Sequence, residues 1–168
     1  MLLIYHKMKN NTKNILVIIT IIILTSLSYF NTLNNSFVYD DNTYVVENRQ
    51  IRSVSNIPKA FISSYPPDSK GQGLYRPLVT VSYIIDYALW GLNPKGFHLA
   101  NIIFHILTSI IVYLLAFEII KTQWPSAVVG IVFALHPVHT EAVTWVVGRA
   151  EVMAGLFYFL AFLFYVFL

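Results

Sequence analysis

Residues 97–120 read FHLANIIFHILTSIIVYLLAFEII, an apolar run interrupted by a few regularly spaced polar side chains. At 1.5 Å per residue, a helix over this run is roughly 36 Å long, enough to cross a bilayer core of about 30 Å. The polar residues recur every three or four positions and so share one helix face: they are His98, Asn101, His105 and Thr108. Because polar groups are costly against lipid, this polar stripe is expected to contact other helices. The run therefore predicts a membrane-spanning helix inside a helical bundle.

The composition of the whole chain also points to a membrane protein. Of its 168 residues, 57% are hydrophobic and 11% are charged, against roughly 25% charged residues in a soluble domain. Such a chain is neither disordered nor an ordinary soluble globule. The net charge of +3 forms no basic patch, which argues against a nucleic-acid partner. The sequence has no cysteine, so a disulfide framework, a thiolate metal site and a cysteine nucleophile are excluded.

Three further apolar runs bring the predicted number of transmembrane helices to about four. They cover residues 15–30, 124–137 and 152–168. A basic tail at 1–14, with Lys7, Lys9 and Lys13, precedes the first run and places the N-terminus in the cytoplasm. A cleavable signal peptide is the alternative, but no small-residue cleavage site follows the run. The last run has no polar flank, which leads us to expect that the chain is a fragment of a longer protein.

Residues 31–96 form a long polar connection that is predicted to lie outside the membrane. Within it, residues from about 77 to 90 are apolar but hold Asp86 and several aromatic side chains. This pattern predicts a helix along the outer membrane surface, with Tyr83, Tyr87 and Trp90 at the level of the lipid headgroups. The sequence thus predicts an all-α integral membrane protein with about four transmembrane helices, an interfacial helix and a long first external loop.

Two adjacent acids in the external loop, Asp40 and Asp41, are the first candidates for chemistry. They follow the apolar cluster Phe37-Val38-Tyr39, which could bury a carboxylate in part. A partly buried and positioned carboxylate can accept a proton from an alcohol. A metal site and simple solvation of the loop are the alternatives that an isolated acid pair leaves open.

A second group of ionisable residues falls in the polar segment 138–151 and just before it. Counting the predicted spans puts this group on the same side of the membrane as the acid pair. Its His-x-x-His-x-Glu spacing could bind zinc, but it is not the His-Glu-x-x-His pattern of metalloproteases. Pairing within the protein and a pocket for a polar substrate or phosphate are the alternatives. The group consists of His136, His139, Glu141, Arg149 and Glu151.

A third candidate is Arg76, which stands at the start of the predicted interfacial helix in the sequence Tyr75-Arg76-Pro77. An arginine at this position can extend to the phosphates of the surrounding lipids. It can equally bind the phosphate of a lipid-linked substrate, and the sequence does not decide between the two.

The order of these motifs says more than any one of them. The chain reads FVYDD at 37–41, YRPL at 75–78, GFHLAN at 96–101, HPVHTEAV at 136–143 and GRAE at 148–151. Over residues 35–165, this series resembles the transmembrane, tetratricopeptide-repeat-containing protein O-mannosyltransferases and their prokaryotic relatives. That family belongs to the GT-C superfamily of integral-membrane glycosyltransferases. The resemblance therefore implies the N-terminal part of a GT-C fold.

The resemblance also implies roles for individual residues. Asp40 matches the first acid of the family's loop motif, the expected general base. Asp41 matches the second acid, for which a supporting or substrate-binding role is expected, although the family usually has Asp-Glu rather than Asp-Asp. Arg76 and Arg149 are assigned to the donor phosphate. The other pocket candidates are His136, His139, Glu141 and Glu151, and no metal site is assigned.

The implied activity is transfer of a sugar, with mannose expected, from a polyprenyl-phosphate donor to a protein serine or threonine or to a glycan. Because the lipid phosphate is itself the leaving group, this transfer needs no added energy source. The sequence requires no cofactor, and a divalent metal is an alternative that it does not support. The membrane would be the plasma membrane of a bacterium or archaeon, or the endoplasmic reticulum of a eukaryote. The family's later helices and its C-terminal repeats are absent, so we expect these residues alone to be inactive. A non-catalytic membrane scaffold or subunit is the main alternative, followed by a transporter or a metal hydrolase.

Overall fold

The computed structural model of this chain describes residues 12–66 and 73–167. Within these ranges the chain is helical, and its extended pairing is a single bridge between Tyr65 and Leu74. Most of the predicted basic tail at 1–14 lies outside the described residues. The prediction of an all-helical protein is confirmed.

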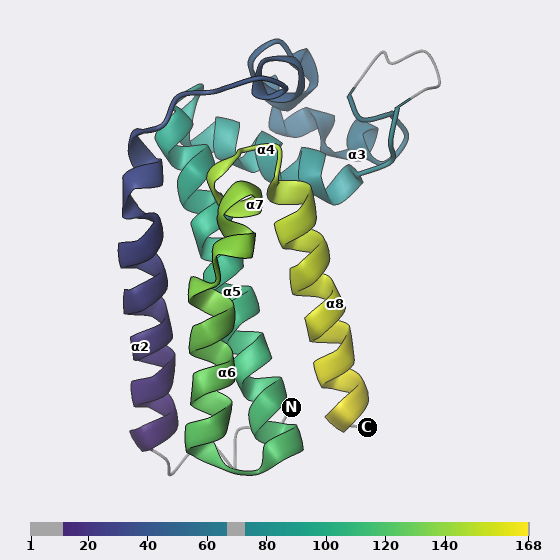
Figure 1. Ribbon diagram of the computed structural model, residues 1–168. Helices are drawn as coiled ribbons and strands as arrows, with labels where there is room; N and C mark the ends of the chain where they lie inside the picture. Colours follow the sequence, from purple (N-terminus) through teal and green to yellow (C-terminus); the bar gives the residue numbers. More distant parts are fainter. Residues whose placement is uncertain (1–11, 67–72, 168) are drawn as a thin grey trace.

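Four helices run side by side and form a bundle (Figure 1). Helix α5 packs against the other three. Helices α2, extended to residue 34, α5 and α8 are long and apolar enough to cross a membrane. Helix α6 becomes a fourth span if it is counted together with the short helices that follow it. These spans confirm the predicted membrane class. The bundle helices are α2 (Thr12–Tyr29), α5 (Pro94–Ile120), α6 (Gln123–Leu135) and α8 (Arg149–Phe167).

The fourth span is bent, because a proline follows α6. His136 has φ −65° and ψ 128°, an extended conformation that is favoured before Pro137 and ends the helix. Its Nδ1 accepts a hydrogen bond from the backbone N–H of Val138 at 3.2 Å. The chain then continues as η5 (Pro137–His139) and α7 (Thr140–Thr144), inclined by 40° to α6.

Helix α4 (Pro77–Trp90) lies across one end of the bundle (Figure 1) and contacts α5 and α8. Proline at its first position needs no hydrogen bond, and Gly91 beyond its end has a φ of +59° that disfavours other residues. Several short helical turns cover the same end of the bundle. They are η1 (Phe30–Asn34), η2 (Asn42–Val46), η3 (Arg49–Arg52), η4 (Val54–Asn56) and α3 (Ile57–Ala60).

Three apolar clusters hold these parts together. One joins the predicted external loop to α4 and α5, and its fully buried members include Val45, Tyr83 and Phe97. Another lies between α2, α5 and α6 around Ile21 and Tyr113. The third joins α2 and α5 to α7 and α8 through Tyr29, Ile102, Val143 and Val152. The external loop is therefore packed as a helical cap onto the end of the bundle. The predicted polar stripe of α5 is confirmed as interior, since all four of its side chains are buried.

Two helices begin earlier than the apolar runs suggest. Helix α5 starts at Pro94 because Asn93 caps it, its Oδ1 accepting the backbone N–H of Lys95 at 3.2 Å. Helix α8 starts at Arg149, and Glu151 in its first turn interacts favourably with the helix dipole. Arg149 and Glu151 thus belong to a bundle helix and not to a polar connection.

Candidate active site

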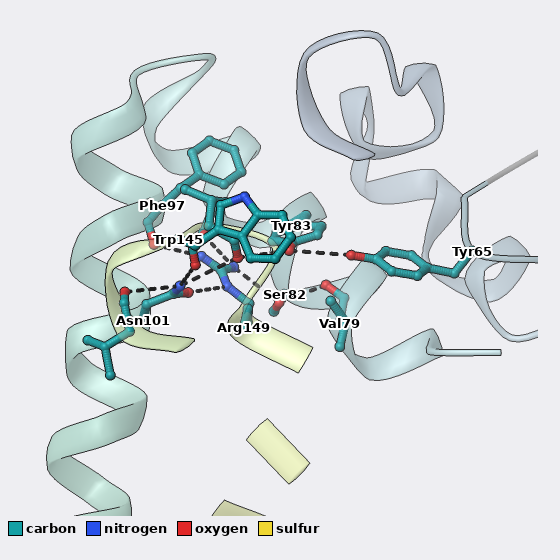
Figure 2. A network of polar contacts seen from close by, with 11 residues as sticks. Tyr65, Val79, Ser82, Tyr83, Phe97, Asn101, Trp145 and Arg149 are labelled. Atoms are coloured by element: carbon teal, nitrogen blue, oxygen red, sulfur yellow. Dashed lines mark hydrogen bonds and ion pairs between the residues drawn. The ribbon is translucent and has the colours of Figure 1, made fainter. Parts of the chain in front are cut away.

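At the end of the bundle that α4 covers, the central group is the guanidinium of Arg149, which is completely buried (Figure 2). Its Nε donates a hydrogen bond to Asn101 Oδ1 at 2.8 Å, and its Nη2 donates to the carbonyl of Phe97 at 2.8 Å. Its Nη1 donates to Ser82 Oγ at 3.1 Å and lies 2.5 Å from a carboxyl oxygen of Asp86. Arg149 therefore binds α8 to both α4 and α5.

Aromatic rings complete the surroundings of Arg149. The guanidinium carbon lies 4.6 Å from the ring centre of Tyr83, 5.8 Å from that of Phe97 and 5.9 Å from that of Phe104. Such distances give favourable cation–π contacts. Each of the three guanidinium nitrogens thus contacts a protein acceptor. A donor phosphate, which the resemblance assigns to Arg149, would therefore have to compete with protein groups for this guanidinium.

Asp86 balances the charge of Arg149. It is 6% exposed and comes from α4, so the pair joins two helices that are far apart in sequence. Burial raises the pKa of Asp86, and the nearby Arg149 opposes that rise. Sequence reasoning noted Asp86 but did not make it a site residue. The available signal was that Asp86 is the only acid in an otherwise apolar run at 77–90.

The segment 145–148, which connects α7 to α8, is fixed by polar groups from three directions. Asn101 of α5 donates through Nδ2 to the carbonyl of Trp145 at 2.8 Å (Figure 2). Tyr83 of α4, predicted from the sequence to lie at the headgroup level, is instead fully buried, and its hydroxyl donates to the carbonyl of Val146 at 3.1 Å. Burial raises the pKa of Tyr83 to about 12, so the hydroxyl stays protonated and available as a donor. The third group, from the external loop, is Asp41.

Asp41 is fully buried, and both of its carboxyl oxygens accept backbone hydrogen bonds. Oδ2 accepts the N–H of Val38 at 3.0 Å, within the same loop. Oδ1 accepts the N–H of Val147 at 3.0 Å, 106 positions away in the sequence. Burial raises the pKa of Asp41, and these two hydrogen bonds partly oppose the rise. Asp41 therefore ties the external loop to the start of α8.

Asp40, the neighbouring acid, is exposed. Tyr39 before it has a φ of +47°, which is rare and unfavourable for a bulky residue. The side chain of Asp41, two residues after Tyr39, accepts the hydrogen bonds from Val38 and Val147 and so holds this backbone in place. As a result, adjacent acids point to different surroundings: Asp41 into the protein and Asp40 out of it. The two acids, to which the resemblance assigns different roles, thus also have different surroundings in the structure.

Gly148 allows this part of the chain to pack closely. A Cβ atom at this position would lie 2.5 Å from the carbonyl oxygen of Ala142 and 2.9 Å from its Cα. Both are backbone atoms of α7, which could move away only by distorting that helix. Glycine is therefore required where the 145–148 segment turns back over α7 to begin α8.

Arg76 lies beside a cavity of about 410 Å³ between α4 and α8. Arg76 is half-buried, and its guanidinium carbon lies 5.7 Å from the ring centre of Tyr65. The walls of the cavity are mostly apolar, with Val79 and Leu78 from α4 and Phe157 from α8 among them. Glu151 also borders it. This groove has an apolar interior and a cation at its edge, the features needed to hold a lipid with an anionic headgroup.

The histidine candidates do not join this arrangement. His136 and Glu141 are exposed, while His139 is half-buried against Phe133, with 4.4 Å between ring centres. His105 of the polar stripe lies 5.2 Å from His139 and contacts the carbonyl of Ala134 through Nε2 at 3.1 Å. Within residues 12–66 and 73–167, no three histidine or acidic side chains are placed to hold a metal ion. The zinc alternative thus has no assembled ligand set in this part of the chain.

A change at Asp41 is expected to release the external loop. In Asp41→Asn, the amide keeps one acceptor oxygen but turns its NH₂ group toward one of the two N–H donors. A buried donor left without its acceptor costs about 1–3 kcal/mol. We expect limited proteolysis between residues 31 and 48 to become about tenfold faster or more, while Asp40→Asn keeps the wild-type rate. Equal protection of both variants would contradict the anchoring role of Asp41.

Comparison with known proteins shows which proteins have a similar sequence. The chain is 36% identical over 146 residues to "Protein O-mannosyl-transferase Tmtc1" of Drosophila melanogaster, which covers 84% of this chain. It is 33% identical over 159 residues to "Protein O-mannosyl-transferase TMTC3" of Homo sapiens, covering 92% of this chain. The mouse protein named TMTC1 is 38% identical over 148 residues, or 83% of the chain. This chain is a homologue of the protein O-mannosyl-transferases.

The similarity to the protein O-mannosyl-transferases covers one part of those proteins. The matched region is 17% of the fly and human proteins and 15% of the mouse protein, so the chain spans about a sixth of their length. No family model matches the chain, and no solved structure matches it either. The predicted resemblance is confirmed by these relatives.

Proposed function

We propose that this chain forms the donor-binding and base-bearing end of an integral-membrane glycosyltransferase. The enzyme would transfer mannose from a polyprenyl-phosphate donor to a hydroxyl acceptor such as a protein serine or threonine. The names of the relatives support the reaction class. The observation that carries the site is the bond from Asp41 to Val147, which fixes the loop of Asp40 against the start of α8. The groove of Arg76 borders the same helix end.

The proposed transfer needs a carboxylate that accepts a proton and side chains that position the two substrates. The acceptor oxygen attacks the anomeric carbon, and its proton passes to a carboxyl oxygen of Asp40. The bond from the anomeric carbon to the phosphate oxygen breaks, and its electron pair stays on that oxygen. The leaving group is therefore the polyprenyl phosphate. Attack from the face opposite the phosphate inverts the anomeric configuration. Positioning of the two substrates and proton removal are both effects by which a protein accelerates such a step.

In this proposal the four candidate residues have different roles. Asp40 is the general base, and Asp41 is a positioning residue that holds the loop. Arg76 binds the donor phosphate, with the lipid tail in the apolar groove between α4 and α8. Arg149, each of whose guanidinium nitrogens donates to a protein acceptor, is a positioning residue that fixes the start of α8. No metal ion takes part.

The same proposal places the chain in the membrane. The bundle would be the first part of a GT-C fold, with α4 along the outer surface. Lys7 and Lys9 precede the first span and Lys13 lies in its first turn, and in this proposal these bases put the N-terminus on the cytoplasmic side. The external loop and the Arg76 groove then lie on the opposite side, where the acceptor is reached from solvent.

The reaction is tested with membranes that contain the protein expressed from its complete gene. We expect transfer of label from polyprenyl-phosphate mannose to a serine- and threonine-containing peptide, and no transfer from a mannose nucleotide. Membranes without the protein are the control. Absence of transfer with every polyprenyl-phosphate sugar tested would favour the non-catalytic scaffold.

The donor groove is tested by Arg76→Ala. Loss of a charged hydrogen bond worth about 1.5–3 kcal/mol should raise KM for the polyprenyl-phosphate donor about 10- to 100-fold. Arg76→Lys should recover part of the loss, because it keeps the charge without the forked geometry. The matched control is Lys95→Ala, which removes an exposed cation from the start of α5. An equal change in KM for both alanine variants would argue against a specific phosphate contact by Arg76.

A further inference from the structure

The external loop contains a second cavity, which differs in chemistry from the Arg76 groove. Its volume is about 750 Å³, and its walls come from η2, η3, α3 and the residues that follow α3. Polar side chains dominate the lining, among them the hydroxyls of Thr43, Ser63 and Ser64. A volume of this size is in the range of ligand-binding sites. The cavity therefore suits a hydrophilic ligand rather than a lipid.

One buried side chain in this cavity lacks a partner. Gln50 lines the cavity and is 7% exposed. Its Nε2 donates a hydrogen bond to Ser63 Oγ at 2.6 Å, which fixes the orientation of the amide. Its Oε1 has no hydrogen-bond partner among the described residues. A buried acceptor without a donor is unfavourable, so a ligand that supplies an N–H or O–H there is stabilised.

The backbone around Gln50 is rigidly held before any ligand arrives. Asn48 Oδ1 accepts the N–H of Gln50 at 2.9 Å, and Asn56 Nδ2 donates to its carbonyl at 2.8 Å. Asn48 Nδ2 in turn donates to the carbonyl of Tyr44 at 3.0 Å. The backbone that carries Gln50 is therefore already in place at the cavity wall, which lowers the entropic cost of binding.

The position of the cavity points to one of the two substrates. Its wall residue Thr43 follows Asp41 by two positions, so the cavity adjoins the loop that carries Asp40. Glu47, Arg49 and Lys59 add charges of both signs to the lining. Amide, hydroxyl and mixed charged groups match a polypeptide, whose backbone offers N–H donors and carbonyl acceptors along its length.

We propose that this cavity binds the acceptor polypeptide, as an extended segment that contains serine or threonine. Gln50 Oε1 accepts a backbone N–H or a hydroxyl of that segment, and Ser64 Oγ, whose hydrogen is donated to the carbonyl of Pro66, can accept another. This inference rests on the proposed function, because it assigns the acceptor of the same reaction. It gives the enzyme two separate entrances, with the lipid donor beside α8 and the peptide in the external loop.

The test is peptide binding in the absence of donor. The protein from its complete gene is purified in detergent and titrated with a fluorescent 12-residue peptide of alternating threonine and alanine, read by anisotropy. Thr43→Trp places a bulky ring in the cavity from an exposed position. The matched control is Val54→Trp, an exposed position in η4. Thr43→Trp should raise Kd at least about tenfold, and Val54→Trp should leave it within about twofold.

Gln50→Met provides a second variant, because it keeps the length of the side chain and removes the amide. It should raise Kd about fivefold or more while the far-ultraviolet circular dichroism stays that of wild type. Equal affinities of wild type, Thr43→Trp and Gln50→Met would overturn the proposal. The proposal would also be overturned if the protein bound methyl mannoside or inorganic phosphate but not the peptide, and Thr43→Trp weakened that binding. The cavity would then be a glycan site or an anion site.

Transfer measured in parallel separates this inference from the proposed function. Peptide binding that Thr43→Trp abolishes, in a protein that transfers no mannose, would uphold the peptide site and refute the transferase. Mannose transfer by Thr43→Trp with an unchanged KM for the peptide would uphold the transferase and refute the peptide site.

Discussion

Asp40→Asn is expected to lower the rate of mannose transfer by about 10²- to 10⁴-fold, the usual contribution of a general base. The amide has nearly the same size as the carboxyl group but cannot take the acceptor proton. The side chain of Asp40 is exposed, and its backbone carbonyl, which accepts the N–H of Tyr44 at 2.9 Å, is unchanged by the substitution. The loss should therefore fall on kcat, with KM for the donor close to the wild-type value.

A nucleophile that needs no deprotonation distinguishes a missing base from a damaged site. Azide should react with the donor in the Asp40→Asn protein and form mannosyl azide, because the donor pocket is intact. In wild type, azide should compete poorly with the hydroxyl acceptor. An Asp40→Asn protein that loses transfer but forms no mannosyl azide would indicate damage to donor binding rather than loss of a base.

Arg149→Met is expected to destabilise the protein by about 3–5 kcal/mol, because it leaves Asp86 buried without its cation. It also removes the donors to Asn101, Ser82 and the carbonyl of Phe97. Arg149→Lys should recover little of this loss, since one ammonium group cannot replace three nitrogens that point to acceptors on two helices. The measurement is the midpoint of thermal unfolding in detergent.

Two controls make this prediction specific. Lys95→Met removes an exposed cation and should change the free energy of unfolding by less than about 0.5 kcal/mol. The double variant Arg149→Met, Asp86→Leu should be more stable than Arg149→Met alone, because it removes the unpaired acid. If the double variant were less stable than the single one, the charge of Asp86 would not be the source of the loss.

The class of fold could be predicted from sequence because it depends on local patterns. Apolar runs of the right length, such as residues 97–120, predict spanning helices whatever lies next to them. The stripe formed by His98, Asn101 and His105 follows from helical spacing alone. The end of α6 at His136 follows from the proline after it. In each case the cause and the effect lie within a few residues of one another.

The roles of the charged residues could not be predicted in the same way. Arg149 and Asp86 are 63 positions apart, and nothing local to either residue shows that they pair. An arginine near a membrane surface suggests a phosphate ligand until its partners are known. Likewise, Asp40 and Asp41 are neighbours with the same chemistry. The resemblance assigns them different roles, but the contact of Asp41 with Val147, which gives that acid its surroundings, comes from the tertiary fold and could not be predicted.

The most direct test of the proposed site compares wild type, Asp40→Asn and Asp41→Asn in the same membranes at matched expression. Transfer of label from polyprenyl-phosphate mannose to peptide and protease protection of residues 31–48 are measured together. The predicted result is that Asp40→Asn loses transfer and keeps protection, while Asp41→Asn loses both. An Asp40→Asn protein that transfers mannose at the wild-type rate with its loop protected would contradict the assignment of the base.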